Sequence, residues 1–552
     1  MRRSSSGGQW DVLWSTGLLG LGLVMFCADI GGVPLRDWDE GIVAQVAREI
    51  GRSPLESLRW LYPTLFGEPY LNKPPLMHIL IALSYHLGGV SEWTTRLPGA
   101  LLSAISVPLL YGVGREVFLG RTAAVLSTLV YLTSLAVVRN GRLAMLDGAV
   151  LCFSLGMLLC LLRSRRDVRW SLGVGVAFGL ICLTKGILGL LLGAIALGFL
   201  AWDTPRLLST GYFWGGWLVG AIPAVGWYLA QWLHYGALFW NNNLVDQSFS
   251  RVWSAVESNA GPPWYYLLEL LKYGWPWLIF LPMGLRLAWE HRSLSWAKLA
   301  MTWGGGYLLV ISAMGTKLPW YVLPVYPAIA LVIGAALREV WHQGTLTPAK
   351  PHVAPDYPRA WCLSFGLLAL VAWAGCLYFS FSAEADADLQ LTFGALGLTF
   401  TATSALLWRH DLQFLLVLLS GCYLSLVLLG QSDHWVWELG EDYPVKPVAA
   451  MVQQHTPTGR TVYTSHPYHR PSLNFYSDRP IRPASLEHLQ QIWQQEASPY
   501  FLLSTGAATA LKLKDAQTVA QTHTWQLVTR AAADSLAEPP RAAFRTGGDR
   551  LS

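Results

Sequence analysis

Long apolar segments recur along almost the whole chain, and they constrain its fold more than any other feature. A helix that crosses a bilayer needs about 20 consecutive apolar residues. Such windows predict thirteen transmembrane helices, at residues 12–31, 97–116, 122–138, 148–163, 171–184, 187–202, 212–232, 264–286, 297–314, 322–338, 361–381, 390–408 and 412–430. The low charged fraction, 13%, agrees, because polytopic membrane proteins carry few charges. We therefore expect an all-α membrane domain over residues 1–430.

The composition changes after the last apolar window. Residues 431–552 are richer in polar side chains, above all in Gln. Short runs there have the pattern of regular elements: strands at 461–464 and 500–503, and helices at 445–454 and 485–495. We expect a small α/β domain over residues 431–552, with a disordered tail beyond Ala531.

The basic residues indicate how the chain is oriented. Short loops rich in Lys and Arg face the cytoplasm in most membrane proteins. If thirteen spans alternate, most such loops fall on the side of an uncleaved, cytoplasmic N-terminus, and the loop 32–96 and the C-terminal domain fall on the opposite side. The basic residues of that outer side include Arg36, Lys73, Arg96, Arg139, Arg142, Lys185, Arg251 and Lys317. Because Lys and Arg are usually rare in loops on the outer side, their presence there suggests that they bind an anion.

The first outer loop places acids and a lysine at the edge of the bilayer. It opens with Asp37-Trp38-Asp39-Glu40 and closes with Asn72-Lys73-Pro74-Pro75. Charged groups beside hydrocarbon cost several kcal/mol, on the order of 3, unless they line a polar cavity. The apolar spacing after Glu40 predicts an amphipathic interfacial helix over 42–50, so Asp39 could equally be a helix cap. Residues 76–87 are too short to span and predict a second interfacial helix.

Two further outer turns carry charge. The turn from Arg139 to Asp147 ends in an acid that could simply cap the next helix, and Arg142 could reach lipid headgroups instead of a ligand. Lys185 could likewise be the end of a helix that reaches the interface. The prolines after Lys317 would break a plain helix, so that segment is expected to shape a cavity.

Over roughly residues 15–340 the chain resembles a known family, the GT-C glycosyltransferases that use lipid-linked sugars, of the protein O-mannosyltransferase and lipid A aminoarabinose transferase type. The resemblance rests on short motifs in this order: Asp39-Glu40, Ala47-Arg48-Glu49-Ile50, Tyr70-Leu71-Asn72-Lys73-Pro74-Pro75-Leu76, Glu92-Trp93, Arg96-Leu97-Pro98, Gly141-Arg142, Asp147, Leu183-Thr184-Lys185-Gly186, Pro263-Trp264-Tyr265-Tyr266, Lys317-Leu318-Pro319 and Leu323-Pro324-Val325-Tyr326-Pro327. It implies a GT-C fold in the bacterial inner membrane, with the catalytic cavity and the C-terminal domain in the periplasm.

The resemblance also implies a reaction. A sugar would move from a polyprenyl-phosphate donor to a lipid, glycan or protein acceptor, with inversion at the anomeric carbon. The expected catalytic acids are Asp39, Asp147 and Glu40, with Asp39 as the general base. The expected groups at the donor phosphate are Lys73, Arg142, Lys317 and Tyr321.

Some positions depart from the aminoarabinose branch of that family. The branch has an acid before the Lys-Pro and an arginine after the Asp-Glu, where this chain has Asn72 and Ile42. No cofactor is therefore assigned, because the ligands of a possible divalent metal are altered, and the donor sugar and acceptor stay open. The net charge of +5 is small for a chain of this length and predicts no nucleic-acid partner. A lipid-linked-sugar transporter or flippase, and a membrane scaffold for the C-terminal domain, are the alternatives.

Overall fold

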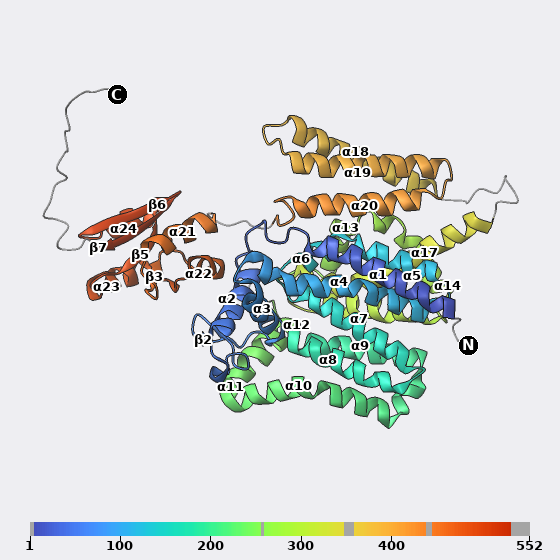
Figure 1. The fold of residues 1–552 in the computed structure, drawn as a ribbon, viewed down its shortest axis with the longest axis horizontal. Coiled ribbons are helices and arrows are strands. Elements are labelled where there is room, and N and C mark those ends of the chain that lie inside the picture. Colours follow the sequence, from blue (N-terminus) through green and yellow to red (C-terminus); the bar gives the residue numbers. More distant parts are fainter. Residues whose placement is uncertain (1–4, 256–258, 347–357, 438–443, 531–552) are drawn as a thin grey trace, which may run out of the picture. The chain divides into compact units, whose positions relative to one another are not determined.

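The computed structural model describes residues 5–255, 259–346, 358–437 and 444–530. The chain forms two compact units (Figure 1). The first consists of Met1–Leu35 and Val46–Glu438, and the second of Arg36–Gln45 and Leu439–Ser552. A short piece of the first outer loop therefore belongs to the same unit as the C-terminal domain, which the sequence did not indicate.

The first unit is almost entirely helical. Its α-helices are α1 (Ser5–Cys27), α3 (Leu76–Gly88), α4 (Glu92–Val117), α5 (Arg121–Leu132), α6 (Leu135–Arg142), α7 (Asp147–Ser164), α8 (Ser171–Lys185), α9 (Leu188–Asp203), α10 (Gly211–Tyr235), α11 (Ala237–Phe239), α12 (Ser250–Trp253), α13 (Tyr265–Tyr273), α14 (Leu281–Glu290), α15 (Ser295–Ala300), α16 (Tyr307–Ala313), α17 (Tyr326–Leu346), α18 (Arg359–Phe381), α19 (Ala387–Trp408) and α20 (Phe414–Gln431). Shorter elements are the 3-10 turns η1 (Leu55–Ser57), η2 (Val168–Trp170), η3 (Pro205–Ser209), η5 (Trp277–Ile279) and η7 (Pro319–Val325), the π-helical η4 (Trp240–Phe249) and η6 (Met301–Gly306), and the hairpin β1 (Thr64–Leu65) and β2 (Glu68–Pro69). The helix α2 (Asp39–Arg52) begins in the second unit's segment and continues into the first.

The all-helical membrane architecture is confirmed, but the helices are less regular than expected. Among the described residues, eight helices are long and apolar enough to cross a membrane, or nine if the bent pair α5 and α6 counts as one span. The predicted span 264–286 is interrupted between α13 and α14, where Gly274 and Pro276 fall. The predicted span 297–314 contains the π-helical η6. Apolar windows register hydrophobicity and do not detect such breaks in a helix.

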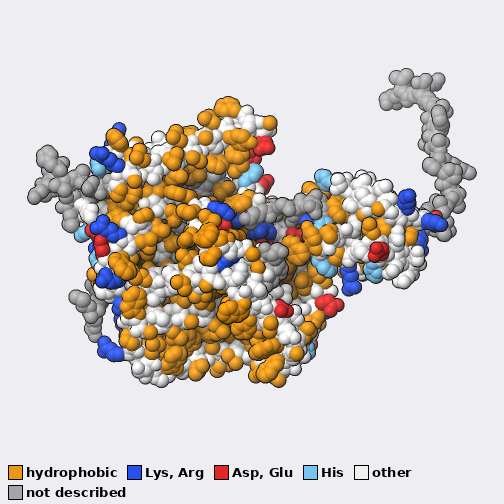
Figure 2. All heavy atoms as spheres, turned by 180° about the vertical axis from the view of Figure 1, so that it is seen from behind, with side chains coloured by type: hydrophobic (Ala, Val, Ile, Leu, Met, Phe, Trp, Pro, Cys, Tyr) orange, Lys and Arg blue, Asp and Glu red, His pale blue; other side chains and the backbone are white. Residues whose placement is uncertain are grey.

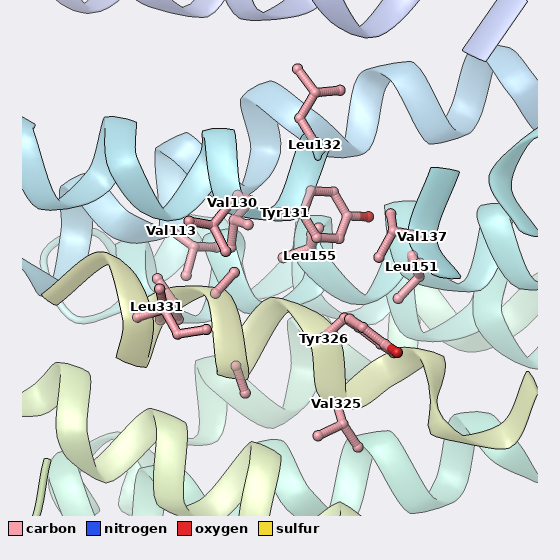
Figure 3. Packing of buried hydrophobic residues seen from close by; sticks show 14 of the residues in the cluster. Val113, Val130, Tyr131, Leu132, Val137, Leu151, Leu155, Val325, Tyr326 and Leu331 are labelled. Atoms are coloured by element: carbon pink, nitrogen blue, oxygen red, sulfur yellow. The ribbon is translucent and has the colours of Figure 1, made fainter. Parts of the chain in front are cut away.

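A single large apolar core holds the helices of this unit together. Val113 of α4, Tyr131 of α5, Leu155 of α7 and Leu331 of α17 are at most 1% exposed and belong to this one cluster (Figure 3). On the face shown in Figure 2, hydrophobic side chains cover most of the unit, and basic side chains gather along one edge. An apolar belt with a basic edge is the surface expected of a protein that spans a bilayer.

The second unit contains an α/β fold. Within residues 444–530 a five-stranded sheet has the order β4-β3-β5-β7-β6, with β3 parallel to β4 and β5, and β7 antiparallel to β5 and β6. The strands are β3 (Val462–Thr464), β4 (Ile481–Pro483), β5 (Tyr500–Ser504), β6 (Ala516–Thr522) and β7 (Trp525–Arg530), and the helices are α21 (Val445–His455), α22 (Pro471–Ser477), α23 (Leu486–Gln495) and α24 (Thr505–Leu511). The predicted strands and helices of this domain are confirmed, while its tail lies outside the described residues.

Candidate functional site

A cavity of about 540 Å³ lies in the first unit. Most of its lining is aliphatic or aromatic and comes from α9, α12, α16 and η7. The apolar lining residues are Ile187, Leu188, Leu190, Leu191, Val252, Trp253, Tyr307, Leu309, Val310, Ile311, Ala313, Met314, Trp320 and Tyr321, and the polar ones are Lys73, Asp147, Lys185, Gln247 and Arg251. An apolar pocket with a few convergent polar groups is the form that ligand sites usually take.

Asp147 and Lys185 form an ion pair in this cavity. Asp147 is the first residue of α7, and Lys185 is the last residue of α8. Gly186, with φ 61°, then turns the chain sharply into α9, which keeps Lys185 at the break. The Lys185 Nζ lies 2.6 Å from the Asp147 Oδ1, and both side chains are nearly buried. Asp147 is therefore not a helix cap, and Lys185 does not extend to the interface.

Arg251 comes to the cavity from an irregular helical segment. The π-helical η4 leads into the short α12, which carries Arg251. Its guanidinium donates to the Gln247 Oε1 at 3.0 Å, and a second nitrogen lies 3.4 Å from the Tyr321 hydroxyl. The Lys185 Nζ lies 5.7 Å from the centre of the Tyr321 ring, so both cations are close to Tyr321.

Lys317 holds the loop that supports Arg251. Its Nζ donates to the carbonyls of Ser312 at 2.7 Å and Met314 at 2.6 Å, where α16 ends. The next residue toward the N-terminus, Thr316, donates its backbone N–H to the carbonyl of Arg251 at 3.0 Å. Burial lowers the pKa of Lys317. Lys317 is thus not among the described residues that line the cavity, although it was expected at the donor phosphate.

Arg142 is also bound to the backbone and is not among the cavity residues. It is 2% exposed and donates to the carbonyl of Met25 at 2.8 Å and to that of Gly430 at 2.5 Å. Its guanidinium lies over the ring of Trp435, 4.6 Å from the centroid. These contacts join α1, α6 and the end of α20. A role for Arg142 at the donor phosphate stays a prediction, and the structure gives this side chain a packing role.

Lys73 reaches the cavity from the first outer loop. It stands between Asn72, which is exposed, and the two prolines that begin α3. Together with Lys185 and Arg251 it gives the described lining three cations against the single carboxylate of Asp147. The polar part of the cavity therefore carries a net positive charge, which suits a phosphate group.

Asp39 and Glu40 belong to the second unit. Asp39 begins α2 and pairs with Arg36, with 3.1 Å between the Oδ2 and the Nη2. Glu40 is fully buried and accepts a hydrogen bond from the backbone N–H of Arg36 at 2.9 Å. The amphipathic helix predicted here is confirmed. The catalytic roles of both acids stay predictions.

The described residues contain no group of three or more His, Cys, Asp or Glu side chains that could hold a metal ion.

The sequence-based reasoning missed several cavity residues. Arg251 stood out only as a basic residue on the outer side, Lys185 was noted in a family motif without a role in binding, and Gln247 and Trp253 gave no signal. Because η4 is irregular, helical periodicity could not assign the side of Gln247 or Arg251. Of the expected phosphate-binding groups, Lys73 and Tyr321 lie at the cavity.

Known proteins are similar to this chain in sequence and in fold. The family model described as dolichyl-phosphate-mannose-protein mannosyltransferase matches residues 72–228. Two relatives are undecaprenyl phosphate-alpha-4-amino-4-deoxy-L-arabinose arabinosyl transferases. The one from Pseudomonas fluorescens is 30% identical over 54% of this chain and 55% of its own length, and the one from Pectobacterium carotovorum is 30% identical over 61% and 60%. The chain thus spans between half and two thirds of these relatives.

Solved structures establish the fold. ArnT from Cupriavidus metallidurans, crystallised with undecaprenyl phosphate, superposes with a TM-score of 0.76 at 21% identity, over 96% of this chain and 99% of its own. The archaeal oligosaccharyltransferase AglB from Archaeoglobus fulgidus superposes with a TM-score of 0.53 at 11% identity, over 91% of this chain and 70% of its own. The chain thus has the fold of these solved structures and is similar in sequence to the undecaprenyl phosphate aminoarabinose transferases.

Proposed function

We propose that this protein is an inverting glycosyltransferase of the bacterial inner membrane that takes a sugar from a polyprenyl-phosphate donor. The observation that carries the proposal is the cavity, in which Lys73, Lys185 and Arg251 meet a wall of aliphatic side chains. A lipid phosphate has the matching chemistry, an anion joined to a long apolar chain. The related ArnT was crystallised with undecaprenyl phosphate, which supports this choice of donor.

The apolar wall suits the prenyl chain. Leu188, Leu191 and Leu309 line it together with Met314 and Trp253. Burying apolar surface contributes roughly 25 cal/mol per Å², so several isoprene units in this cavity add substantially to binding. The same wall gives a free sugar nucleotide no comparable contact, so the proposal excludes that donor class.

The cations have a role in the transfer step. As the bond between the anomeric carbon and the phosphate oxygen breaks, the electron pair and a negative charge move to the phosphate. Preorganised donors at such a developing charge contribute on the order of 3 kcal/mol each. Lys73 and Arg251 are the proposed donors. Asp147 holds the Lys185 side chain at the cavity through an ion pair, with 2.6 Å between the Nζ and the Oδ1.

The acceptor must give up a proton if it attacks through a hydroxyl. Its oxygen forms the new bond to the anomeric carbon, and the proton passes to a carboxylate. Asp39 is the proposed base, on the strength of its position in the family motif. The acceptor is proposed to be a lipid, glycan or protein of the cell envelope. The similarity favours a transferase over a transporter or flippase.

A purified assay tests this proposal. The full-length protein in nanodiscs is supplied with polyprenyl-phosphate sugars extracted from its host, and released polyprenyl phosphate is measured by mass spectrometry. We expect turnover by the wild type and a loss of about 100-fold or more in Asp39→Asn, since a general base contributes about that much. The matched control is Arg286→Gln, which removes one member of an exposed ion pair with Glu290.

Glycan and lipid mass spectrometry of a deletion strain names the product. One glycosylated molecule should disappear while its polyprenyl-linked donor accumulates. If Asp39→Asn turns over like the wild type, Asp39 is not the base. If no envelope lipid or glycan changes in the deletion strain, the transferase proposal itself is wrong.

A further inference from the structure

The C-terminal domain binds the start of the first outer loop through a buried carboxylate. Asp37 is 8% exposed and accepts three hydrogen bonds. The Arg470 Nε donates at 2.7 Å, the backbone N–H of Ser472 at 3.0 Å and the hydroxyl of Ser472 at 2.6 Å. Arg470 itself is 4% exposed. A buried charge held by an arginine and two further donors is an expensive arrangement to break, costing about 3–5 kcal/mol.

A backbone contact lies beside this ion pair. Gly41 packs so closely on the C-terminal domain that a Cβ added there would lie 2.7 Å from the backbone nitrogen of Ser472. The ring of Trp38 lies 5.7 Å from that of Tyr468, centroid to centroid. The five-residue span from Asp37 to Gly41 is thus fixed to the C-terminal domain at both of its ends.

Asp39 lies inside this span. The carbonyl of Arg36 accepts from the backbone N–H of Gly41 at 2.8 Å, and Glu40 accepts from the backbone N–H of Arg36. These bonds close a tight turn at the start of α2. Asp39 is in this turn and pairs with Arg36 at 3.1 Å. The backbone of Asp39 therefore cannot move without breaking contacts on either side of it.

We propose that the C-terminal domain is a positioning device for the reaction, and that Asp37 and Arg470 are positioning residues that hold Asp39. This inference rests on the proposed role of Asp39 as the base. The clamp consists of Asp37, Arg470, Ser472 and Gly41. It acts on the geometry of the base, while the cations that bind the donor phosphate belong to the other unit. Loosening the clamp should therefore lower kcat and leave the KM for the lipid donor unchanged.

Steady-state kinetics of four variants, Asp37→Asn, Gly41→Ala, Arg470→Lys and Arg470→Gln, test this. Asp37→Asn removes the charge, Gly41→Ala places a methyl group against Ser472, and Arg470→Lys keeps the charge but loses the planar group. A misplacement of about 1 Å in a reacting group costs up to about 100-fold. We expect kcat to fall at least about tenfold in Asp37→Asn and Gly41→Ala, with an unchanged KM, and partial recovery in Arg470→Lys relative to Arg470→Gln.

The control is Glu496→Gln, which weakens a hydrogen bond with Tyr463 inside the same domain and leaves the clamp intact. Its kcat should equal that of the wild type. A fall as large as that of Asp37→Asn would show a general loss of folding and overturn the positioning role.

Hydrogen exchange provides a readout that does not depend on turnover. The amides of residues 40–45 should exchange faster in Asp37→Asn and Gly41→Ala than in the wild type, and those of α17 should not change. Wild-type kcat in both variants, beside an inactive Asp39→Asn, would overturn the positioning role alone. Full activity of Asp39→Asn would overturn the proposed base, and with it the reason for the clamp. Wild-type exchange rates in both variants would also contradict the clamp.

Discussion

Two buried side chains of the cavity carry opposite charges at 2.6 Å from each other. Removing Asp147 would leave the Lys185 ammonium buried without its carboxylate, and leaving one member of a buried pair typically costs about 3–5 kcal/mol. The pair therefore stabilises the position of the Lys185 side chain in the cavity. A cation in a pocket of low polarity is suited to bind an anion strongly. From the sequence alone, Asp147 could equally have been a helix cap and Lys185 the end of a helix.

His78 of α3 provides a prediction at the residue scale. It is fully buried beside Tyr70, and burial lowers its pKa to about 4 from the ordinary value of 6.5. In the unfolded chain His78 binds a proton below about pH 6.5, whereas in the folded chain it binds one only below about pH 4. Stability should therefore be complete above pH 6.5 and fall by up to roughly 3 kcal/mol as the pH drops to 4.

Thermal unfolding in detergent between pH 4 and 7.5 measures this loss. In His78→Phe the step between pH 6.5 and 4 should be smaller by that amount. An identical pH profile for the variant and the wild type would show that His78 is not the group responsible. His86→Phe serves as the control, because the side chain of His86 is exposed.

At the scale of elements, one tryptophan connects three helices of the first unit. Trp435 follows α20 and is 2% exposed. The guanidinium of Arg96 from α4 lies 5.0 Å from its ring centroid, and that of Arg142 from α6 lies 4.6 Å from it. Arg96 also donates to the carbonyl of Val33 beyond α1 at 2.7 Å. Desolvated cation–π contacts contribute about 2 kcal/mol each, so this joint secures the end of the last helix hairpin.

Trp435→Ala should destabilise the protein by about 3–5 kcal/mol, since it empties a packed site and exposes two arginines. Trp437→Ala is the matched control. Trp437 is 42% exposed, and the guanidinium of Arg139 lies 3.9 Å from the centroid of the Trp437 ring. Removing this exposed side chain should therefore cost much less stability. Melting temperatures of the two purified variants provide the comparison. Equal melting temperatures would mean that the joint does not hold the helices.

Elements that depend on local composition could be predicted from the sequence, and contacts between distant elements could not. Apolar length predicted the membrane helices, and apolar spacing predicted α2 and the helices of the C-terminal domain. Lys73 and Tyr321, which the family resemblance placed at the donor phosphate, line the cavity. Arg142 and Lys317 were expected there for the same reason, yet backbone carbonyls bind them. Whether a basic side chain binds backbone carbonyls or lines the cavity depends on the three-dimensional fold.

For the whole molecule, the division into units is the feature that no local pattern predicts. Arg36–Gln45 belongs with a domain that begins some four hundred residues later in the chain. Asp37 contacts Arg470 across that separation. Such a contact closes a very long loop, which carries a large entropic cost, so it must be stable enough to outweigh that cost. A three-bond buried carboxylate meets this requirement.

The most direct test of the account is a cryo-EM structure of the full-length protein in nanodiscs with saturating undecaprenyl phosphate. We expect density for the phosphate within hydrogen-bond reach of Lys73 or Arg251, and density for the chain along Leu188 and Leu191. A cavity that remains empty at saturating lipid, or a phosphate bound away from these cations, would contradict the account.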